Sequence, residues 1–558
     1  MWFIDLYLMK FLAKSPYKLW LTLSIVTTIL FSLSSLKVAF QNLYTIQDDA
    51  RQYIFWMQQF QNKGLFQNDL IADYFQSVTP IGFTNLYRLV GNLGINVFFF
   101  NKISTIIIGI FTTIYAFLVC LEIFPVPFAG FISSLLLNQN LWMVDDLSSG
   151  TPRAYIYVLL LAFIYYLLRQ NRLLCLLTIV MQGLFYPQAV LISIAVLSLR
   201  LIQYKKTPKI EWLLLTGIVI LLAYSFKTTN FAPVITAKQA SLLPEFLPGG
   251  RSAFFSDSLI QFWLTDRRSG FFPIEWQYSL MCSYGIGILW LKQYPNRFLL
   301  VKEIKPTIKV LLELFLASTL LFLSAHLLLF KLHLPSRYTH HTLRIILALI
   351  DGITIAVVFN KINSWFHKKI SKNYCLKLLF LILLLCGLLY PTYAVQSYPE
   401  RLGYVTGKAE KLYKFIQQQP EDTLIATLSE ESDFIPSLTA RSVLIAQEYA
   451  IPYHQGYYQQ IDLRVRELIT AQYSADEKIL KDFINKYQID LLLVDRDAFT
   501  VKYLVNNQWL QQFQPETEQT INLLKKQVKP ILSQYSDRCA VFSDQDRILI
   551  DTNCLQLN

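Results

Sequence analysis

The chain carries little charge for its length. Charged residues make up 16% of its 558 residues, whereas a soluble domain usually has about 25%. This composition excludes an intrinsically disordered chain and a coiled coil, and the length excludes a secreted mini-protein. Hydrophobic residues make up 54% of the chain. They occur in long uninterrupted runs, and runs of about 20 apolar residues are typical of membrane-spanning helices.

Cysteine is scarce as well, with 7 residues, five of them in or beside apolar runs. The other two, Cys539 and Cys554, flank a stretch that resembles a β-hairpin. We expect these two to form a disulfide in an oxidising outer compartment, with two free thiols as the alternative. We expect no cleavable signal peptide, because the first apolar run is too long for one and lacks a clear small-residue cleavage site.

The apolar runs predict eleven membrane-spanning segments. The fifth and sixth are short and meet at Tyr186-Pro187, where the missing proline N–H favours a break. These two are either separate half-length helices or one kinked span. The predicted segments are Leu19–Val38, Val97–Leu121, Val126–Val144, Ala154–Leu168, Leu173–Phe185, Gln188–Leu201, Trp212–Phe226, Trp276–Leu291, Val310–Phe330, Leu343–Phe359 and Leu376–Val395.

Lysine and arginine cluster in alternate loops when the two short segments are counted separately. By the positive-inside rule these loops are cytoplasmic. We therefore expect a cytoplasmic N-terminus, eleven crossings and an extracytoplasmic C-terminus. The rich use of Gln, Tyr and Leu with few Gly and Met favours a bacterium, and hence its inner (plasma) membrane. The basic residues lie in loops rather than on one face, so nucleic-acid binding is not expected.

Two domains follow from this arrangement. Residues 1–396 are predicted to form a transmembrane domain with a large first extracytoplasmic loop at 39–96, and residues 397–558 an extracytoplasmic α/β domain. In the second domain, short buried strands and a helix indicate a small α/β layer. The predicted strands are Thr423–Leu428, Ser442–Ala446 and Asp490–Val494, and the predicted helix is Ser474–Tyr487. The fold class is thus an α-helical polytopic membrane protein with a C-terminal soluble α/β domain.

The first outer loop opens with the acidic pair Asp48-Asp49. After it, four apolar residues recur at helical spacing, which predicts a helix that lies in the membrane interface. These residues are Tyr53, Trp56, Met57 and Phe60. An aspartate before a helix is often only an N-cap, and capping explains one acidic residue better than two.

A second acidic pair, Asp145-Asp146, follows the third segment on the same face. It too has capping as its structural alternative. Like charges brought together either raise one pKa or bind a cation, so a divalent cation is a possible cofactor. Either outcome suits a site that deprotonates an acceptor hydroxyl.

These features resemble the GT-C superfamily, which comprises polytopic glycosyltransferases that use polyprenyl-phosphate-linked sugars. Its pattern places an acidic pair after the first span, matched here by Asp48-Asp49, and a second acidic position in the next outer loop, matched by Asp145-Asp146. Many members end in a soluble outer domain. The WWD-type motif of the oligosaccharyltransferases is absent from the C-terminal residues, which argues against a close relative of the asparagine-linked enzymes.

The resemblance implies an inverting transfer of sugar from a lipid phosphate to a glycan, lipid or protein acceptor. It makes Asp48 the general base, with Asp49 or Asp145 orienting it or holding a divalent ion. Arg337 and Arg153 are the candidates for binding the donor phosphate. For Arg153 an interfacial anchor is an equal alternative.

Other polar residues are weaker candidates for function. His340 and His341, with His333 nearby, suit polar loop positions better than a metal site. Asp351 is an intramembrane carboxylate and so a functional candidate. A tyrosine-rich stretch is expected at an interface between the C-terminal domain and the membrane domain; it contains Tyr449, Tyr453, His454, Tyr457 and Tyr458. A transporter, or a non-catalytic protein that presents its C-terminal domain, remains the alternative function, although the sequence shows no repeat of broken helices.

Overall fold

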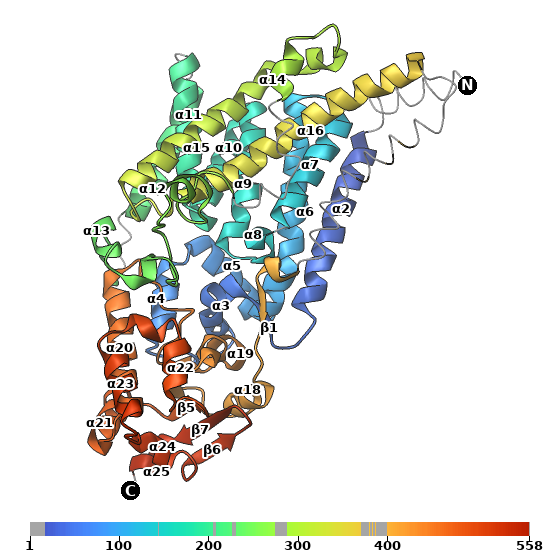
Figure 1. Ribbon diagram of the computed structural model, residues 1–558. Helices are drawn as coiled ribbons and strands as arrows, with labels where there is room; N and C mark the ends of the chain where they lie inside the picture. The colour runs from blue at the N-terminus through green and yellow to red at the C-terminus, as the bar shows by residue number, and fades with distance from the viewer. Residues whose placement is uncertain are drawn as a thin grey trace.

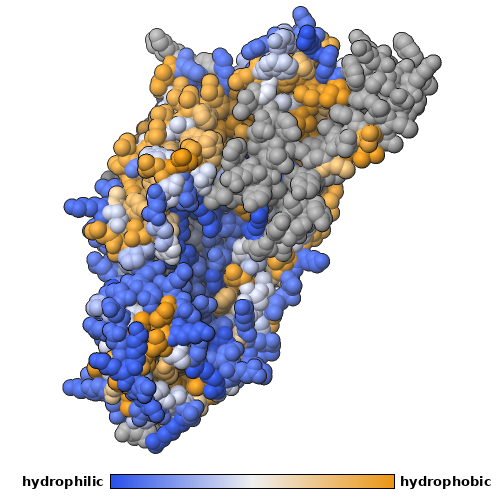
Figure 2. All heavy atoms as spheres, viewed as in Figure 1, coloured by the Kyte–Doolittle hydropathy of each residue, from blue (hydrophilic) through white to orange (hydrophobic). Residues whose placement is uncertain are grey.

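The computed structural model describes residues 17–142, 144–204, 208–225, 230–273, 287–369 and 399–556, together with residues 379, 382 and 386. Apolar helices form one end of an elongated molecule, and the C-terminal residues form the other end (Figure 1). The helices of the first loop lie between the two ends. Figure 2 shows apolar surface gathered over the helical end and hydrophilic surface over the C-terminal end. The chain is an integral membrane protein.

Among the described residues, four helices are long and apolar enough to cross a membrane. They are α2 (Tyr17–Ala39), α6 (Val97–Ile123), α15 (Lys309–Leu327) and α16 (Ser336–Lys369). Apolar side chains of α2 face outward, with Leu30 57% and Leu33 52% exposed, as expected of a helix in contact with lipid. Shorter helices complete the bundle: α7 (Pro127–Leu141), α9 (Tyr155–Leu168), α10 (Arg172–Phe185), α11 (Gln188–Tyr204), α12 (Pro208–Ser225) and α14 (Gly287–Lys292).

Small and polar residues hold the bundle together. The hydroxyls of Thr28 in α2 and Thr113 in α6 are 2.6 Å apart, and the Asn138 amide of α7 donates to Thr113 (2.8 Å). Helix α16 packs on α7, where a Cβ at Gly352 would come within 2.6 Å of the Ser133 backbone nitrogen. These are the close approaches and interhelical hydrogen bonds that replace hydrophobic association in a membrane.

The two short predicted segments are separate helices. Helix α10 ends at Phe185 and α11 begins at Gln188. The Ser193 hydroxyl of α11 donates to Gln182 of α10 (2.7 Å), so the chain folds back at the proline. The predicted segment Trp276–Leu291 is described only from residue 287, and Leu376–Val395 only at residues 379, 382 and 386; both otherwise lie outside the described residues.

The C-terminal unit, residues 399–556, is built on a five-stranded sheet of order β4-β3-β5-β7-β6. β3, β4 and β5 are parallel, and β7 and β6 join them antiparallel. The three predicted strands and the predicted terminal hairpin are confirmed as β3 (Leu424–Thr427), β4 (Ser442–Val443), β5 (Leu491–Asp495), β6 (Ala540–Ser543) and β7 (Arg547–Asp551). Cys539 and Cys554 form a disulfide at the open end of that hairpin.

Helices cover this sheet. The predicted helix begins at Glu477, after its N-cap Asp476, and buries Phe483 and Ile484 while Ile479 stays 41% exposed. The helices of the unit are α18 (Glu410–Gln417), α19 (Ile435–Thr439), α20 (Gln455–Tyr473), α21 (Glu477–Tyr487), α22 (Val501–Asn506), α23 (Glu516–Lys525), α24 (Ile531–Tyr535) and α25 (Thr552–Gln556).

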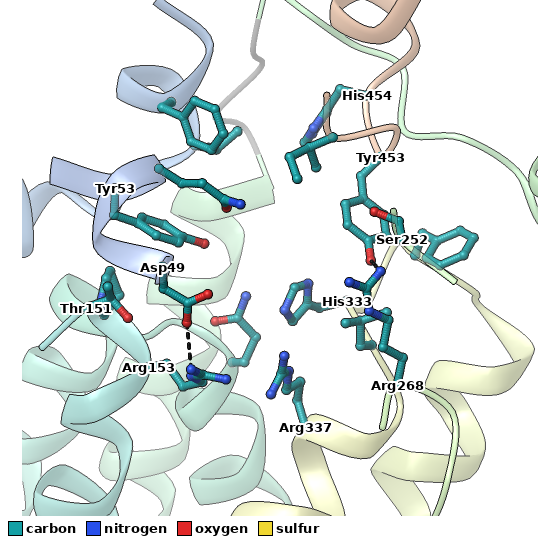
Figure 3. Close-up of a pocket in the computed structure, with 18 of the residues that line it drawn as sticks. Asp49, Tyr53, Thr151, Arg153, Ser252, Arg268, His333, Arg337, Tyr453 and His454 are labelled. Carbon is teal, nitrogen blue, oxygen red and sulfur yellow. Dashed lines mark hydrogen bonds and ion pairs between the residues drawn. The ribbon is translucent and has the colours of Figure 1, made fainter. Parts of the chain in front are cut away.

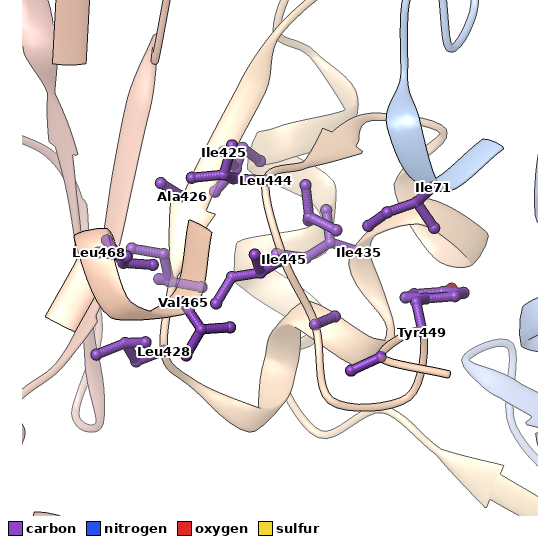
Figure 4. Packing of buried hydrophobic residues seen from close by; sticks show 14 of the residues in the cluster. Ile71, Ile425, Ala426, Leu428, Ile435, Leu444, Ile445, Tyr449, Val465 and Leu468 are labelled. Atoms are coloured by element: carbon purple, nitrogen blue, oxygen red, sulfur yellow. The ribbon is translucent and has the colours of Figure 1, made fainter. Parts of the chain in front are cut away.

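The first loop packs into the core of the C-terminal unit rather than against lipid. It contains α3 (Asp48–Ile54), a 3₁₀ turn at Phe55–Phe60, α4 (Leu70–Val78) and α5 (Ile81–Asn92). The stripe expected in the membrane interface is inside the protein: Trp56 and Met57 have no exposed surface, and the Phe55 ring lies 5.1 Å from that of Tyr449. Figure 4 shows Ile71 of the loop beside Tyr449 in the shared core. The interface prediction is therefore wrong, because helical spacing does not tell a lipid-facing stripe from a protein-facing one.

Candidate functional site

A cavity of about 470 Å³ lies where the membrane helices, the first loop and the C-terminal unit meet. Its lining comes from α3, the end of α4, the turn between α10 and α11, the segments around residues 251–268 and 330–337, and residues 451–454. Asp49 enters from one side, whereas Arg268, His333, Arg337 and Tyr453 enter from the other (Figure 3). The volume suits a small polar ligand or the head of a larger one.

A strand pair with the C-terminal unit fixes the first acidic pair. β1 (Thr45–Gln47) pairs antiparallel with β2 (Tyr404–Thr406), and the Asp48 N–H donates to the Gly403 carbonyl (2.7 Å). Gly403 has a φ of +70°, and a Cβ there would lie 3.1 Å from that of Asp145. The side chain that caps α3 is Gln47, which accepts from the Ala50 N–H (3.1 Å). Neither Asp48 nor Asp49 therefore serves as the N-cap of α3.

Arg51 joins Asp48 to the C-terminal unit. Its guanidinium donates to Asp48 and to Glu448 (3.2 Å). Arg251 donates to the other oxygen of Glu448 (2.6 Å), and the Gln52 amide donates to the Glu448 carbonyl (3.0 Å). Glu448 thus ties three parts of the cavity wall together.

Two carboxyl groups in this cluster, those of Glu448 and Asp433, have raised pKa values. Burial, reinforced by the charges of Asp48 and Asp433, raises the pKa of Glu448 to about 8 against the opposing pull of Arg251 and Arg51. Burial likewise raises the pKa of Asp433, which accepts from the Glu448 N–H (2.8 Å), to about 6. The cause is burial in both groups, which disfavours the charged form of a carboxyl.

The guanidinium of Arg153 lies between the two acidic pairs and contacts residues of both. Arg153 Nη2 lies 2.6 Å from Asp49 Oδ2 and 2.9 Å from Asp145 Oδ2, and its Nε lies 3.6 Å from Asp146 Oδ1. The two acidic pairs, 97 positions apart, are thus brought into one site, and Asp145 and Asp146 begin the short helix α8 (Asp145–Ser148) without capping it. Arg153 contacts these carboxylates and the Asp145 carbonyl (3.4 Å), and it also lines the cavity. Its role as a phosphate ligand stays a prediction.

Asp146 is the anchor of this cluster. It is 3% exposed and accepts from Arg344 and from the Tyr157 hydroxyl. Burial alone would raise the pKa of Asp146. The guanidinium groups of Arg344 and Arg153 outweigh burial and hold this pKa well below its usual range. Asp146 is therefore a fixed negative charge, while Asp48 and Asp49 border the cavity itself.

The opposite wall is cationic. Arg268 donates to the Tyr453 hydroxyl (3.3 Å), and Arg267 lies 3.4 Å from Asp145. Burial and the charges of Arg337 and Arg268 lower the pKa of His333 to about 3, so this imidazole is neutral. Arg337 lines the cavity beside it, and within the described part of the chain its guanidinium has no ion-pair partner.

The remaining candidates fall inside the protein. His340 and His341 lie on α16, not in a loop: the first contacts the Gly270 carbonyl (3.1 Å) and the second the Tyr157 hydroxyl (2.8 Å). Asp351 is buried in α16. No group of three or more histidine, cysteine or acidic side chains in the described ranges is arranged to hold a metal ion.

The tyrosine-rich stretch forms the expected interface. Tyr457 stacks on Tyr74 of the first loop at 3.7 Å, and the Tyr458 hydroxyl donates to Glu245. Tyr453 and His454 differ from the rest, because they line the cavity.

Several residues of the site were not predicted from the sequence. Glu448, Arg267, Arg268 and Arg344 come from segments without a recognisable motif, and only the fold brings them to the acidic pairs. Arg51 had a local signal, since it lies three residues after Asp48, where i and i+3 side chains meet on a helix.

Comparison with known proteins gives a likeness in structure but none in sequence. No protein-family model and no curated protein sequence matches the chain. The oligosaccharyltransferase of Archaeoglobus fulgidus in its apo form matches with a TM-score of 0.51 and 11% identity, over 88% of this chain and 72% of that one. AglB of the same organism, in complex with an inhibitory peptide and a dolichol-phosphate, matches with a TM-score of 0.52 and 11% identity, over 89% and 72%. Arabinofuranosyltransferase AftD from Mycobacteria is a weaker likeness, with a TM-score of 0.47 and 14% identity over 86% and 35%.

At these identities the match concerns the fold. It covers 88–89% of this chain. The chain therefore shares its fold with the archaeal oligosaccharyltransferase. This likeness agrees with the GT-C resemblance found in the sequence.

Proposed function

We propose that this chain is an inverting glycosyltransferase, which moves a sugar from a polyprenyl-phosphate-linked donor to an acceptor on the extracytoplasmic face of a bacterial plasma membrane. One observation carries the proposal: a single cavity is lined by the carboxylates of Asp48 and Asp49, and the guanidinium groups of Arg268 and Arg337 enter it from the side opposite Asp49. A base and a cationic site for the leaving group are the two elements that sugar transfer from a phosphate requires.

Asp48 is the general base in this account. Its side chain is 41% exposed, against 28% for Asp49, so it is the more accessible to an acceptor hydroxyl. Arg51 holds one of its oxygens and leaves the other to take the proton as the acceptor attacks the anomeric carbon. Asp49, held by Arg153, orients the acceptor beside it.

The donor phosphate binds at the cationic wall. Arg337 is the main ligand, because it lines the cavity without an ion-pair partner among the described residues, and guanidinium binds phosphate in a bidentate way. Arg268 supports it from the same wall. As the bond between sugar and phosphate breaks, these charges stabilise the departing lipid phosphate. A structural neighbour was solved with dolichol-phosphate, which supports a lipid-linked donor.

The proposal is tested by measuring sugar transfer by the purified chain reconstituted in nanodiscs. Radiolabelled sugars on polyprenyl monophosphate and diphosphate are supplied with membrane extracts as acceptors, and labelled product is separated from donor. We expect product with one donor class, and none after Arg337→Ala at low donor concentration. Absence of product with every donor, together with movement of labelled solute across liposomes, would favour a transporter instead.

A further inference from the structure

Arg153 occupies the centre of the two acidic pairs. One of its nitrogens contacts Asp49 at 2.6 Å and Asp145 at 2.9 Å, and a second lies 3.6 Å from Asp146. Its side chain is only 10% exposed. The point where the three carboxylates converge, which is where a shared divalent ion would have to sit, is filled by guanidinium.

The loop that carries Arg153 is firmly held. The Asn101 amide of α6 donates to the Ser149 carbonyl (3.0 Å), and the Thr151 hydroxyl donates to that of Ser149 (3.0 Å). Pro152 opens the 3₁₀ turn that contains Arg153. Moving the guanidinium aside would separate its charge from the carboxylates that neutralise it.

The charges at this point are already balanced. Asp49, Asp145 and Asp146 face three guanidinium groups, from Arg153, Arg344 and Arg267. Mg²⁺ requires oxygen ligands at about 2.0–2.1 Å in a near-octahedral set and a site with excess negative charge. These carboxylates meet neither requirement while Arg153 stays between them. The residues present therefore do not fit the divalent ion that two acidic pairs alone suggest.

We propose that the Arg153 guanidinium is the resident cation of this site and stands where the acidic pairs would otherwise hold a divalent metal, so that sugar transfer by this chain needs no metal ion. The inference on transfer rests on the proposed function; the inference on metal binding does not. Arg153 is a positioning residue: it draws the second acidic pair onto the first and fixes Asp49 at the rim of the cavity.

The test measures Mn²⁺ binding to the detergent-purified full chain by electron paramagnetic resonance, without donor. Wild type should bind no stoichiometric Mn²⁺, whereas Arg153→Ala should bind one ion per chain and gain thermal stability from it. The double variant Arg153→Ala/Asp145→Asn should lose that ion. Arg337→Ala is the matched control, because it removes a cavity arginine that has no carboxylate partner among the described residues, and it should bind none.

Two results would overturn the proposal. One is a Mn²⁺ ion bound by wild type and released in Asp49→Asn or Asp145→Asn. The other is a folded Arg153→Ala protein that binds no ion. Should Arg153→Ala fail to fold, the wild-type measurement still decides, and Arg153→Lys, which keeps the charge, should bind no Mn²⁺. Transfer by wild type should also survive excess EDTA, and its loss there would contradict the metal-free reaction; failure to transfer any sugar would count against the proposed function alone.

Discussion

Arg51 donates at once to Asp48 and to Glu448, which lies 397 positions further along the chain. The proposed base is thereby connected to the C-terminal unit through one guanidinium. Glu448 also accepts a hydrogen bond from Arg251. The position of the acidic wall therefore depends on that of the C-terminal unit. The C-terminal unit is part of the site rather than an appendage to it.

Glu448→Ala should lower kcat by about 10-fold or more, because Arg51 loses the partner that orients it toward Asp48. The donor KM should change little, since the described contacts of Arg268 and Arg337 do not involve Glu448. Steady-state kinetics of sugar transfer check this prediction, because they give kcat and the donor KM separately. Glu430→Ala, which removes an exposed glutamate of the same unit, is the control, and an equal loss in both variants would argue against a positioning role.

Arg337→Ala should raise the donor KM by roughly 10- to 100-fold, the effect of losing one charge-assisted contact to phosphate. Arg337→Lys should recover part of it, because lysine supplies the charge but not the bidentate fork. The control is Arg169→Ala. Arg169 follows the last residue of α9, its side chain is 58% exposed, and it is not among the residues that line the cavity. Donor titrations that show the same KM in Arg337→Ala as in wild type would remove this residue from the phosphate site.

Docking of the C-terminal unit should weaken as pH rises. The pKa of Glu448 is raised to about 8 in the folded chain, against about 4.3 in an unfolded one. The folded state therefore holds this proton more tightly, so the stability it contributes is fully present below pH 4 and is lost as pH rises through 8. Thermal unfolding between pH 5 and 9 should show this fall in wild type and a flatter profile in Glu448→Gln. A steeper fall in the variant would contradict the assignment.

Cys539→Ser should lower the stability of the C-terminal unit. The disulfide closes a loop with a sequence separation of 15, and a cross-link over such a loop contributes about 3 kcal/mol. Limited proteolysis should then cut the chain near the β6–β7 hairpin faster than in wild type. Cys175→Ser, a buried free cysteine in α10, is the control for loss of a thiol, and equal cleavage rates in wild type and Cys539→Ser would count against the prediction.

Local patterns predicted the elements but not their assembly. Long apolar runs identified α2, α6, α15 and α16, and Pro187 marked the break between α10 and α11, because composition and a missing N–H act within the segment itself. The surroundings of the stripe around Trp56 were misjudged, since its neighbour Phe55 packs against Tyr449 of the C-terminal unit. Glu448 and Arg344 were missed for the same reason: only tertiary structure brings them to Asp48 and Asp146.

The central claim is that Asp48 takes the acceptor proton in the cavity, and Asp48→Asn tests it most directly. Turnover and binding of a radiolabelled polyprenyl-phosphate sugar are measured on the same preparation, with Asp49→Asn in parallel. We expect kcat to fall by a factor of roughly 10²–10⁴ in Asp48→Asn, as for loss of a general base, while donor affinity stays within a few-fold of wild type. Unchanged turnover in Asp48→Asn would contradict the account.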